Sequence, residues 1–179
     1  GHIFLPEYEN DLMPGERKGK DMLNFDKERF IRIQGGAVSI ADMARPLMRS
    51  LLDRGITRLY FMGTGGVQLL TLPAIDVIQR HSSFPVAACY PAQVVLDPPA
   101  GLDDTALVII PSLSGTTRES VELLAFLKAR GVTTLSLTGH VDTPLAREAS
   151  HTFTNFAEDD TSSESFYLQT LILALALLA

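Results

Sequence analysis

Cysteine and tryptophan are nearly absent from this sequence. Its 179 residues include one cysteine and no tryptophan. A single cysteine cannot form an intramolecular disulfide, and it cannot supply a thiol cluster for zinc. A chain without disulfides suits the cytoplasm, and we expect that location. Cys89 lies in the apolar stretch 86–90, which favours a buried, unreactive thiol over a chemical role.

Positive charge is also in short supply. The chain has 15 Lys and Arg against 21 Asp and Glu, which gives a formal net charge of −6. Because the chain is acidic and has no basic tract, we expect neither nucleic acid nor an anionic membrane as a partner. A small anionic ligand is not excluded, since backbone dipoles act locally.

No apolar run is long enough to cross a membrane. The longest, 171–179, has 9 residues, whereas a transmembrane helix needs about 20, and no apolar signal segment opens the chain. The run predicts a buried helix instead. Since no capping signal follows it, we expect this helix to pack on a partner, either a second copy of the chain or a further domain.

Two regions precede the first predicted strand. Residues 1–24 contain Pro, Gly and many charges, and they predict an irregular arm. Residues 25–54 carry apolar side chains at helical spacing and predict a helix with one apolar stripe. The pair Gly35-Gly36 is expected to break or bend this helix, and Pro46 to kink it or to start a second piece.

From residue 58 onwards, short apolar runs alternate with helical patterns. Such alternation predicts parallel strands joined by crossover helices, and continuously apolar strands are typical of a sheet covered on both faces. We therefore predict an α/β fold with three layers, in which flanking helices cover a five-stranded parallel sheet. The expected strands are 58–62, 86–90, 105–111, 133–137 and 152–156, and the expected helices are 67–79, 119–130, 145–149 and 163–179.

The loop after the third strand is the most informative segment. Residues 112–117 read Ser-Leu-Ser-Gly-Thr-Thr and lead directly into a helix. Glycine lets the backbone approach an anion, and free amides at a helix start favour negative charge. Ser112, Ser114 and Thr117 add hydroxyl donors. A simple helix cap is the alternative, but a cap needs one hydroxyl, so the five within residues 112–120 favour a phosphate site.

The turn after the first strand, Gly63-Thr64-Gly65-Gly66, is a weaker signal. It lacks the third spaced glycine of a dinucleotide-binding loop. It is either a tight strand-to-helix turn or a second wall of the same ligand site. The carboxyl ends of parallel strands meet at one edge of the sheet, where ligands bind, so we expect both loops there.

Three other polar segments have structural alternatives. His140 follows the fourth strand and is either an acid or base near the site or an exposed loop residue. Asp159 and Asp160 are expected in a solvated turn, and we expect no metal and no cofactor. Residues 161–164, Thr-Ser-Ser-Glu, fit a capping box, in which a hydroxyl can also touch a ligand.

Several segments together resemble the SIS (sugar isomerase) domain family. Residues 112–117 are similar to its Ser-x-Ser-Gly-x-Thr/Ser signature, and 63–65 to the turn after its first strand. Residues 144–150 and 162–169 resemble two further family segments, so the likeness covers roughly residues 35–179. Residues 24–37 look like the amino-terminal helix of the fructosamine 6-phosphate deglycases, which resemble the isomerase half of glucosamine-6-phosphate synthase.

The resemblance implies a flavodoxin-like SIS fold over residues 25–179 that binds a sugar 6-phosphate. The residues implied to bind phosphate are Ser112, Ser114, Gly115, Thr116 and Thr117, and those implied to bind sugar are Gly63, Thr64, Gly65 and Ser162.

The resemblance also implies an activity, as a phosphosugar aldose-ketose isomerase or a fructosamine 6-phosphate deglycase. A non-catalytic sugar-phosphate sensor and a structural domain without a ligand are the alternatives. These enzymes carry two SIS domains per chain, with the acid/base residues after the first. We therefore expect a homodimer or pairing with a second SIS domain, and we assign no catalytic residue. Leu113 and Thr116 replace the Gln and Glu of the synthase pattern, so roles resting on those groups are not carried over.

Overall fold

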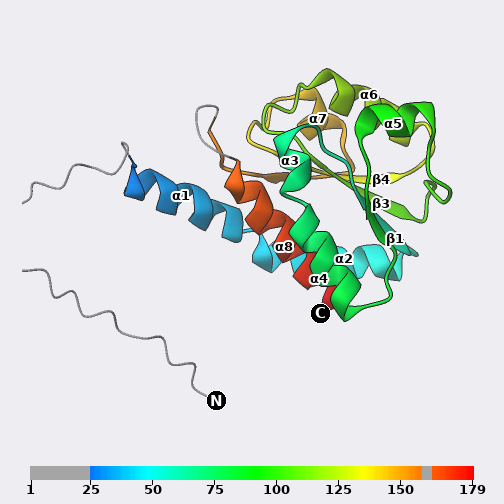
Figure 1. Cartoon of the computed structure of the whole chain (residues 1–179), viewed down its shortest axis with the longest axis horizontal. Helices are drawn as coiled ribbons and strands as arrows, with labels where there is room; N and C mark the ends of the chain where they lie inside the picture. Colours follow the sequence, from blue (N-terminus) through cyan, green and yellow to red (C-terminus); the bar gives the residue numbers. More distant parts are fainter. Residues whose placement is uncertain (1–24, 159–162) are drawn as a thin grey trace, which may run out of the picture.

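A five-stranded sheet forms the centre of the computed structural model, which describes residues 25–158 and 163–179 (Figure 1). The strand order is β2-β1-β3-β4-β5, and every neighbouring pair is parallel. This is the flavodoxin-like order, so the predicted α/β fold class is confirmed. The predicted arm, 1–24, lies outside the described residues. The strands are β1 Arg58–Phe61, β2 Val86–Ala88, β3 Ala106–Pro111, β4 Thr133–Thr138 and β5 His151–Thr154.

Helices cover both faces of the sheet, as the continuously apolar strands predict. Strand β3 is buried along its whole length, and its side chains alternate between two hydrophobic clusters. Leu107 and Ile109 join one cluster, while Val108 and Ile110 join the other. The first cluster includes α2 (Ala41–Asp53), α4 (Leu72–His81) and α8 (Glu164–Leu178), and the second includes α5 (Pro91–Leu96), α6 (Arg118–Lys128) and α7 (Pro144–Glu148).

The predicted helix over 25–54 is two helices, α1 (Lys27–Val38) and α2. The break falls after Val38 and not at Gly35-Gly36, which lie inside α1. Ser39 ends α1, because its hydroxyl and its amide both donate to the carbonyl of Gly36. Pro46 lies inside α2. The helix continues through this proline on its exposed side, where water can solvate the carbonyl that loses its partner.

Helices α3 and α5 also differ from the prediction. The helix expected over 67–79 is α3 (Gly66–Leu69) followed by α4, because the Thr71 hydroxyl donates to the Gln68 carbonyl and a new helix starts at Leu72. Helix α5 was not predicted, since six residues are too few to show a period. Pro91 at its first position is a typical helix start and is the signal that could have found it.

Helix α8 lies on the sheet, and α1 packs against it while projecting beyond the sheet (Figure 1). Phe166, Leu173 and Ala174 of α8 are fully buried, whereas Leu175 is exposed, so the helix predicted over 171–179 is present but is buried on one side only. Within the parts of the chain that the structure describes, no helix combines the length and apolarity that spanning a membrane requires.

Candidate functional site

Two loops meet at the carboxyl edge of the sheet, where β1 and β3 lie side by side. From β1 the chain passes to β2 on one side, and from β3 it passes to β4 on the other. This reversal is the topological switch point at which open parallel sheets bind ligands. Loop 112–117 follows β3, and turn 63–66 follows β1. They are close neighbours, because a Cβ added to Gly63 would lie 3.0 Å from the Pro111 ring.

Three hydroxyl groups of loop 112–117 converge. The Thr117 hydroxyl lies 3.4 Å from that of Ser112 and 3.5 Å from that of Ser114. Ser112 is buried, whereas Ser114 is exposed and accepts a hydrogen bond from the Thr116 amide at 3.3 Å. A hydroxyl can donate and accept, so this cluster can present donors toward a shared anion. Neither Lys nor Arg belongs to the loop itself.

Gly115 gives the loop its shape. Its φ is +63°, a backbone region that only glycine enters at little cost. A Cβ at this position would overlap the Thr143 hydroxyl and would lie 2.8 Å from the Thr138 hydroxyl oxygen. The Gly115 carbonyl also accepts from the Leu145 amide at 3.3 Å. The loop is therefore fixed against the end of β4 and the start of α7.

The start of α6 supports an anion site over a simple cap. Thr117 is the N-cap residue, and its side chain accepts no hydrogen bond from the first-turn amides. The hydroxyls of the loop are thus not consumed as a helix cap, which was the alternative explanation. An 11-residue helix with uncapped amides carries partial positive charge at this end.

Turn 63–66 is held by a side chain that the sequence did not indicate. Gln68 is buried; its amide oxygen accepts from the Gly63 amide, and its amide nitrogen donates to the Phe61 carbonyl at 3.1 Å. Gly65 has a φ of +60°, and Thr64 is half-buried. A glutamine five residues after a glycine is too common a pattern to suggest this brace beforehand.

The segment that leads into α8 agrees only in part with the prediction. Ser162 and Thr161 lie outside the described residues. Helix α8 begins at Glu164, with Ser163 as its N-cap and no side-chain cap bond. A capping box would place Glu164 at the third helical position, so that prediction is wrong for the described part.

A buried polar network joins the end of β5 to α8, and the sequence analysis missed it. The Asn155 amide donates to Gln169 at 2.9 Å and its oxygen accepts from the Ser165 hydroxyl at 2.7 Å. Gln169 in turn donates to the Thr154 carbonyl at 2.7 Å. All three side chains are fully buried. Buried polar groups need such partners, so the network fixes how the chain leaves the sheet.

The remaining candidates are less informative. His140 is exposed, as its interpretation as an exposed loop residue predicts, and its backbone amide donates to the Thr138 hydroxyl at 3.3 Å. Cys89 is half-buried, and burial raises the pKa of its thiol, which disfavours the reactive thiolate. Among residues 25–158 and 163–179, His, Cys, Asp and Glu form no group that could hold a metal ion.

Comparison with known proteins gives a consistent result. Fructosamine deglycase FrlB of Bacillus subtilis is 29% identical over 124 residues, which are 69% of this chain and 37% of the relative. A solved Bacillus subtilis structure described as a phosphosugar isomerase is 25% identical, with a TM-score of 0.62 over 78% of this chain and 45% of its own. This chain therefore spans less than half the length of either protein.

A third similarity concerns the fold. An Escherichia coli CFT073 protein, solved in complex with a sugar-phosphate ligand, is 20% identical, with a TM-score of 0.66 over 84% of this chain and 87% of its own. The SIS domain profile itself matches residues 54–179, which contain the sheet and both loops of the site. Since that match covers most of the sequence, the chain belongs to the SIS domain family.

Proposed function

We propose that this domain binds a phosphorylated sugar or amino sugar at the switch point, with the phosphate in loop 112–117. The observation that carries the proposal is the convergence of three loop hydroxyls beside an uncapped helix start. Ser112, Ser114 and Thr117 donate through their side chains, and Gly115 and Thr116 line the loop with backbone. A phosphate monoester accepts many hydrogen bonds, and helix starts are common phosphate sites.

The sugar would extend from this loop along turn 63–66. Gly63, Thr64 and Gly65 border the loop from β1, and Ser162 is proposed as a further contact. The ligand-bound E. coli relative and the FrlB likeness support a sugar-phosphate ligand.

The chemistry that suits such a ligand is aldose-ketose isomerisation or deglycation of fructosamine 6-phosphate. Both need ring opening and proton transfer at C1 and C2, with a base whose pKa is close to the working pH. The loop offers no such base. Its role is to anchor the phosphate and so to hold the reacting carbons in a fixed position relative to the base. A second SIS domain would complete the site.

Ligand binding tests the proposal. We expect calorimetry to show binding of fructose 6-phosphate or glucosamine 6-phosphate and none of free fructose. Ser114→Ala should weaken binding about ten- to a hundredfold, because a hydrogen bond to a charged group contributes about 1.5–3 kcal/mol. Ser50→Ala, an exposed serine of α2, is the matched control. Equal weak binding of all three sugars would contradict the phosphate site.

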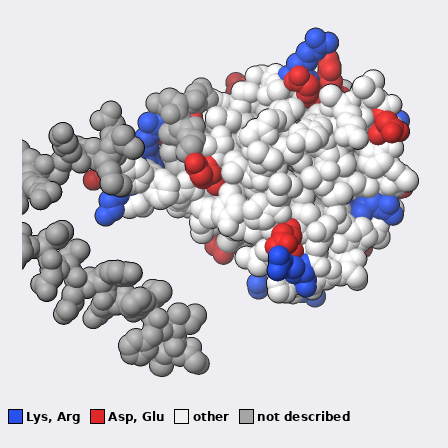
Figure 2. Space-filling model, viewed as in Figure 1, with Lys and Arg blue, Asp and Glu red and all other residues white. Residues whose placement is uncertain are grey.

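We further propose that the domain pairs through the outer surface of α1 and α8. Phe30, Ile31 and Leu175 are 47%, 58% and 58% exposed. A groove of about 160 Å³ lies beside Leu175, between Arg45 of α2 and Ile172 of α8. Exposed apolar side chains of this kind favour association. In Figure 2, Lys, Arg, Asp and Glu are sparse over the middle of the side in view and lie mainly toward its margins.

Light scattering tests the pairing. We expect the purified chain to scatter as a dimer rather than at its 19.5 kDa formula mass. Leu175→Glu should shift it toward the monomer, because a charge at a buried interface is costly. Leu96→Glu, on an exposed α5 leucine in the other helical layer, should not. A wild-type monomer at high concentration would rule out pairing of this chain with its own copy.

A further inference from the structure

The short segment 155–158, between β5 and the start of α8, has a strained backbone. Phe156 has a φ of +69°, and it alone among the described non-glycine residues has a positive φ. The left-handed region is unfavourable for a bulky side chain. Such a conformation persists only when surrounding contacts determine it, and strained residues cluster at ligand clamps.

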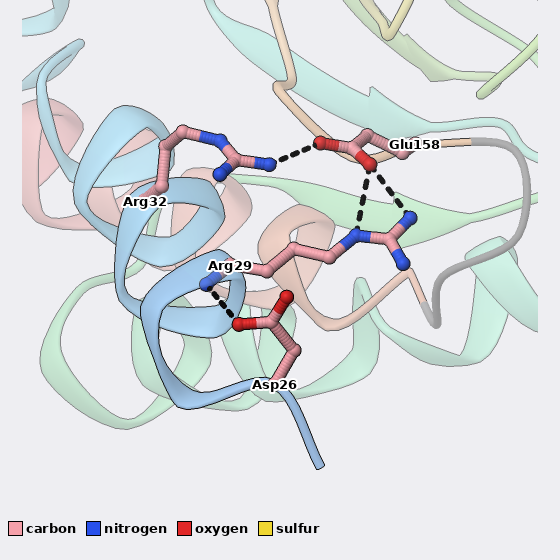
Figure 3. A network of polar contacts seen from close by, with 4 residues as sticks. All are labelled: Asp26, Arg29, Arg32 and Glu158. Carbon is pink, nitrogen blue, oxygen red and sulfur yellow. Dashed lines mark hydrogen bonds and ion pairs between the residues drawn. The ribbon is translucent and has the colours of Figure 1, made fainter. Parts of the chain in front are cut away.

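Helix α1 supplies two of those contacts. The Phe156 ring lies against Gly36, so closely that a Cβ on this glycine would be 2.6 Å from the ring. Glu158 binds two arginines of α1 (Figure 3). Its carboxylate lies 2.6 Å from Arg29 Nη2, accepts from Arg29 Nε at 2.8 Å, and lies 2.7 Å from Arg32 Nη2.

The charge on Glu158 is secured by the same contacts. Hydrogen bonds from Arg32 and then from Arg29 lower the pKa of this carboxyl. Arg29 is the more buried of the two arginines, with a side chain 26% exposed. Exposed ion pairs contribute little to global stability. These ion pairs act by orienting Glu158, because three contacts from two arginines fix the position of its carboxylate.

The other side of the segment lies close to loop 112–117. Gly139 lies between them: a Cβ there would be 3.0 Å from the Ala157 carbonyl oxygen and 2.7 Å from Leu113 Cδ1. The Gly139 amide also donates to the Leu113 carbonyl at 3.0 Å. A continuous path of contacts therefore runs from α1 through 155–158 and Gly139 to loop 112–117.

We infer that α1 positions loop 112–117. Glu158 is the positioning residue, because it holds segment 155–158 against Gly139 and Leu113. This inference rests on the proposed function for its effect on ligand binding, but the coupling between α1 and the loop exists without a ligand. Removing the charge of Glu158 should loosen the loop while leaving the sheet intact.

Amide hydrogen exchange on the full chain without ligand tests the coupling. Two variants break the path at α1, Glu158→Gln and Gly36→Ala. Asp76→Asn, which removes the exposed ion pair with Arg80 on α4, and Gly35→Ala, where an added Cβ meets nothing within 4 Å, are the matched controls. The reporters are the loop-bound amides of Gly115, Gly139 and Leu145, and the Thr57 amide, bonded to the Thr105 carbonyl, is the reference.

We expect the reporters to exchange about tenfold faster or more in both test variants, with Thr57 and both controls unchanged, because only local opening is favoured. Reporter rates within about twofold of the controls would overturn the inference. Equal acceleration at Thr57 would overturn it too, because it would indicate global destabilisation.

Binding of glucosamine 6-phosphate separates the inference from the proposed function. Glu158→Gln should weaken binding about tenfold at an unchanged thermal midpoint, and the double variant Arg29→Gln, Arg32→Gln should do the same. If the wild type binds and Glu158→Gln binds equally well, the positioning role is wrong. If the wild type binds no sugar phosphate, the proposed function fails, and the exchange rates still decide the coupling.

Discussion

Gly115→Ala is expected to weaken sugar-phosphate binding by about a hundredfold or more. A non-glycine residue at the φ of +63° observed here costs about 1–2 kcal/mol. The added methyl would also overlap the Thr143 hydroxyl and crowd Thr138, so the loop must move. A displacement of about 1 Å at a positioning group can cost about a hundredfold. Calorimetric titration with fructose 6-phosphate measures the loss.

Gly131→Ala is the control that isolates this effect. Gly131 has a similar φ, +71°, but a Cβ there would meet its nearest neighbour, Asp104, at 3.9 Å. Both variants carry backbone strain, and only Gly115→Ala carries the collision at the site. We expect Gly131→Ala to lower the free energy of unfolding and to keep wild-type affinity. Comparable affinities of the two variants would place the phosphate elsewhere.

Gln169→Leu is expected to lower the free energy of unfolding by about 3–5 kcal/mol. The change keeps the size of the side chain and removes its amide, which leaves the Thr154 carbonyl and the Asn155 amide without their partner. Each buried polar group left unsatisfied costs about 1–3 kcal/mol. For a chain of this length the thermal midpoint should fall by about 6–20 °C. Thermal and urea unfolding measure both quantities.

Gln79→Leu makes the same chemical change at an exposed position of α4. Surface substitutions of this kind usually change the free energy of unfolding by less than about 0.5 kcal/mol. A similar small change for Gln169→Leu would show that water or a rearranged side chain satisfies the network. The buried contacts around Asn155 would then not determine how the chain leaves β5.

The sequence alone predicted the central layer of this protein well. Strands β3 and β4 match the prediction to within one residue at each end. Strand β3 is apolar throughout, as expected of a parallel strand covered on both faces, whereas β4 alternates leucine with buried hydroxyl side chains. The predicted ends of helices were wrong where the intrinsic preference of a residue conflicts with packing. Gly35 and Gly36 suggest a break by propensity, but the packing of α1 on α8 stabilises a helix through both.

In the candidate site, too, some features could be predicted from the sequence and others could not. Loop 112–117 could be found in the sequence, because its hydroxyls and glycine lie within six residues and their chemistry follows from that local order. The braces of Gln68 and Gln169 could not be found, because a lone glutamine gives no sign of which backbone groups it will satisfy.

The α/β class, the parallel sheet and the hydroxyl-rich loop after β3 can all be predicted from the sequence without the structure. Each depends on neighbours along the chain, through periodicity, propensity and helix starts. Two contacts become evident only in the folded chain: Glu158 binds Arg29, 129 residues away, and the Phe156 ring packs on Gly36. Such contacts arise when segments far apart in the sequence pack together, and no local pattern in either segment specifies the other.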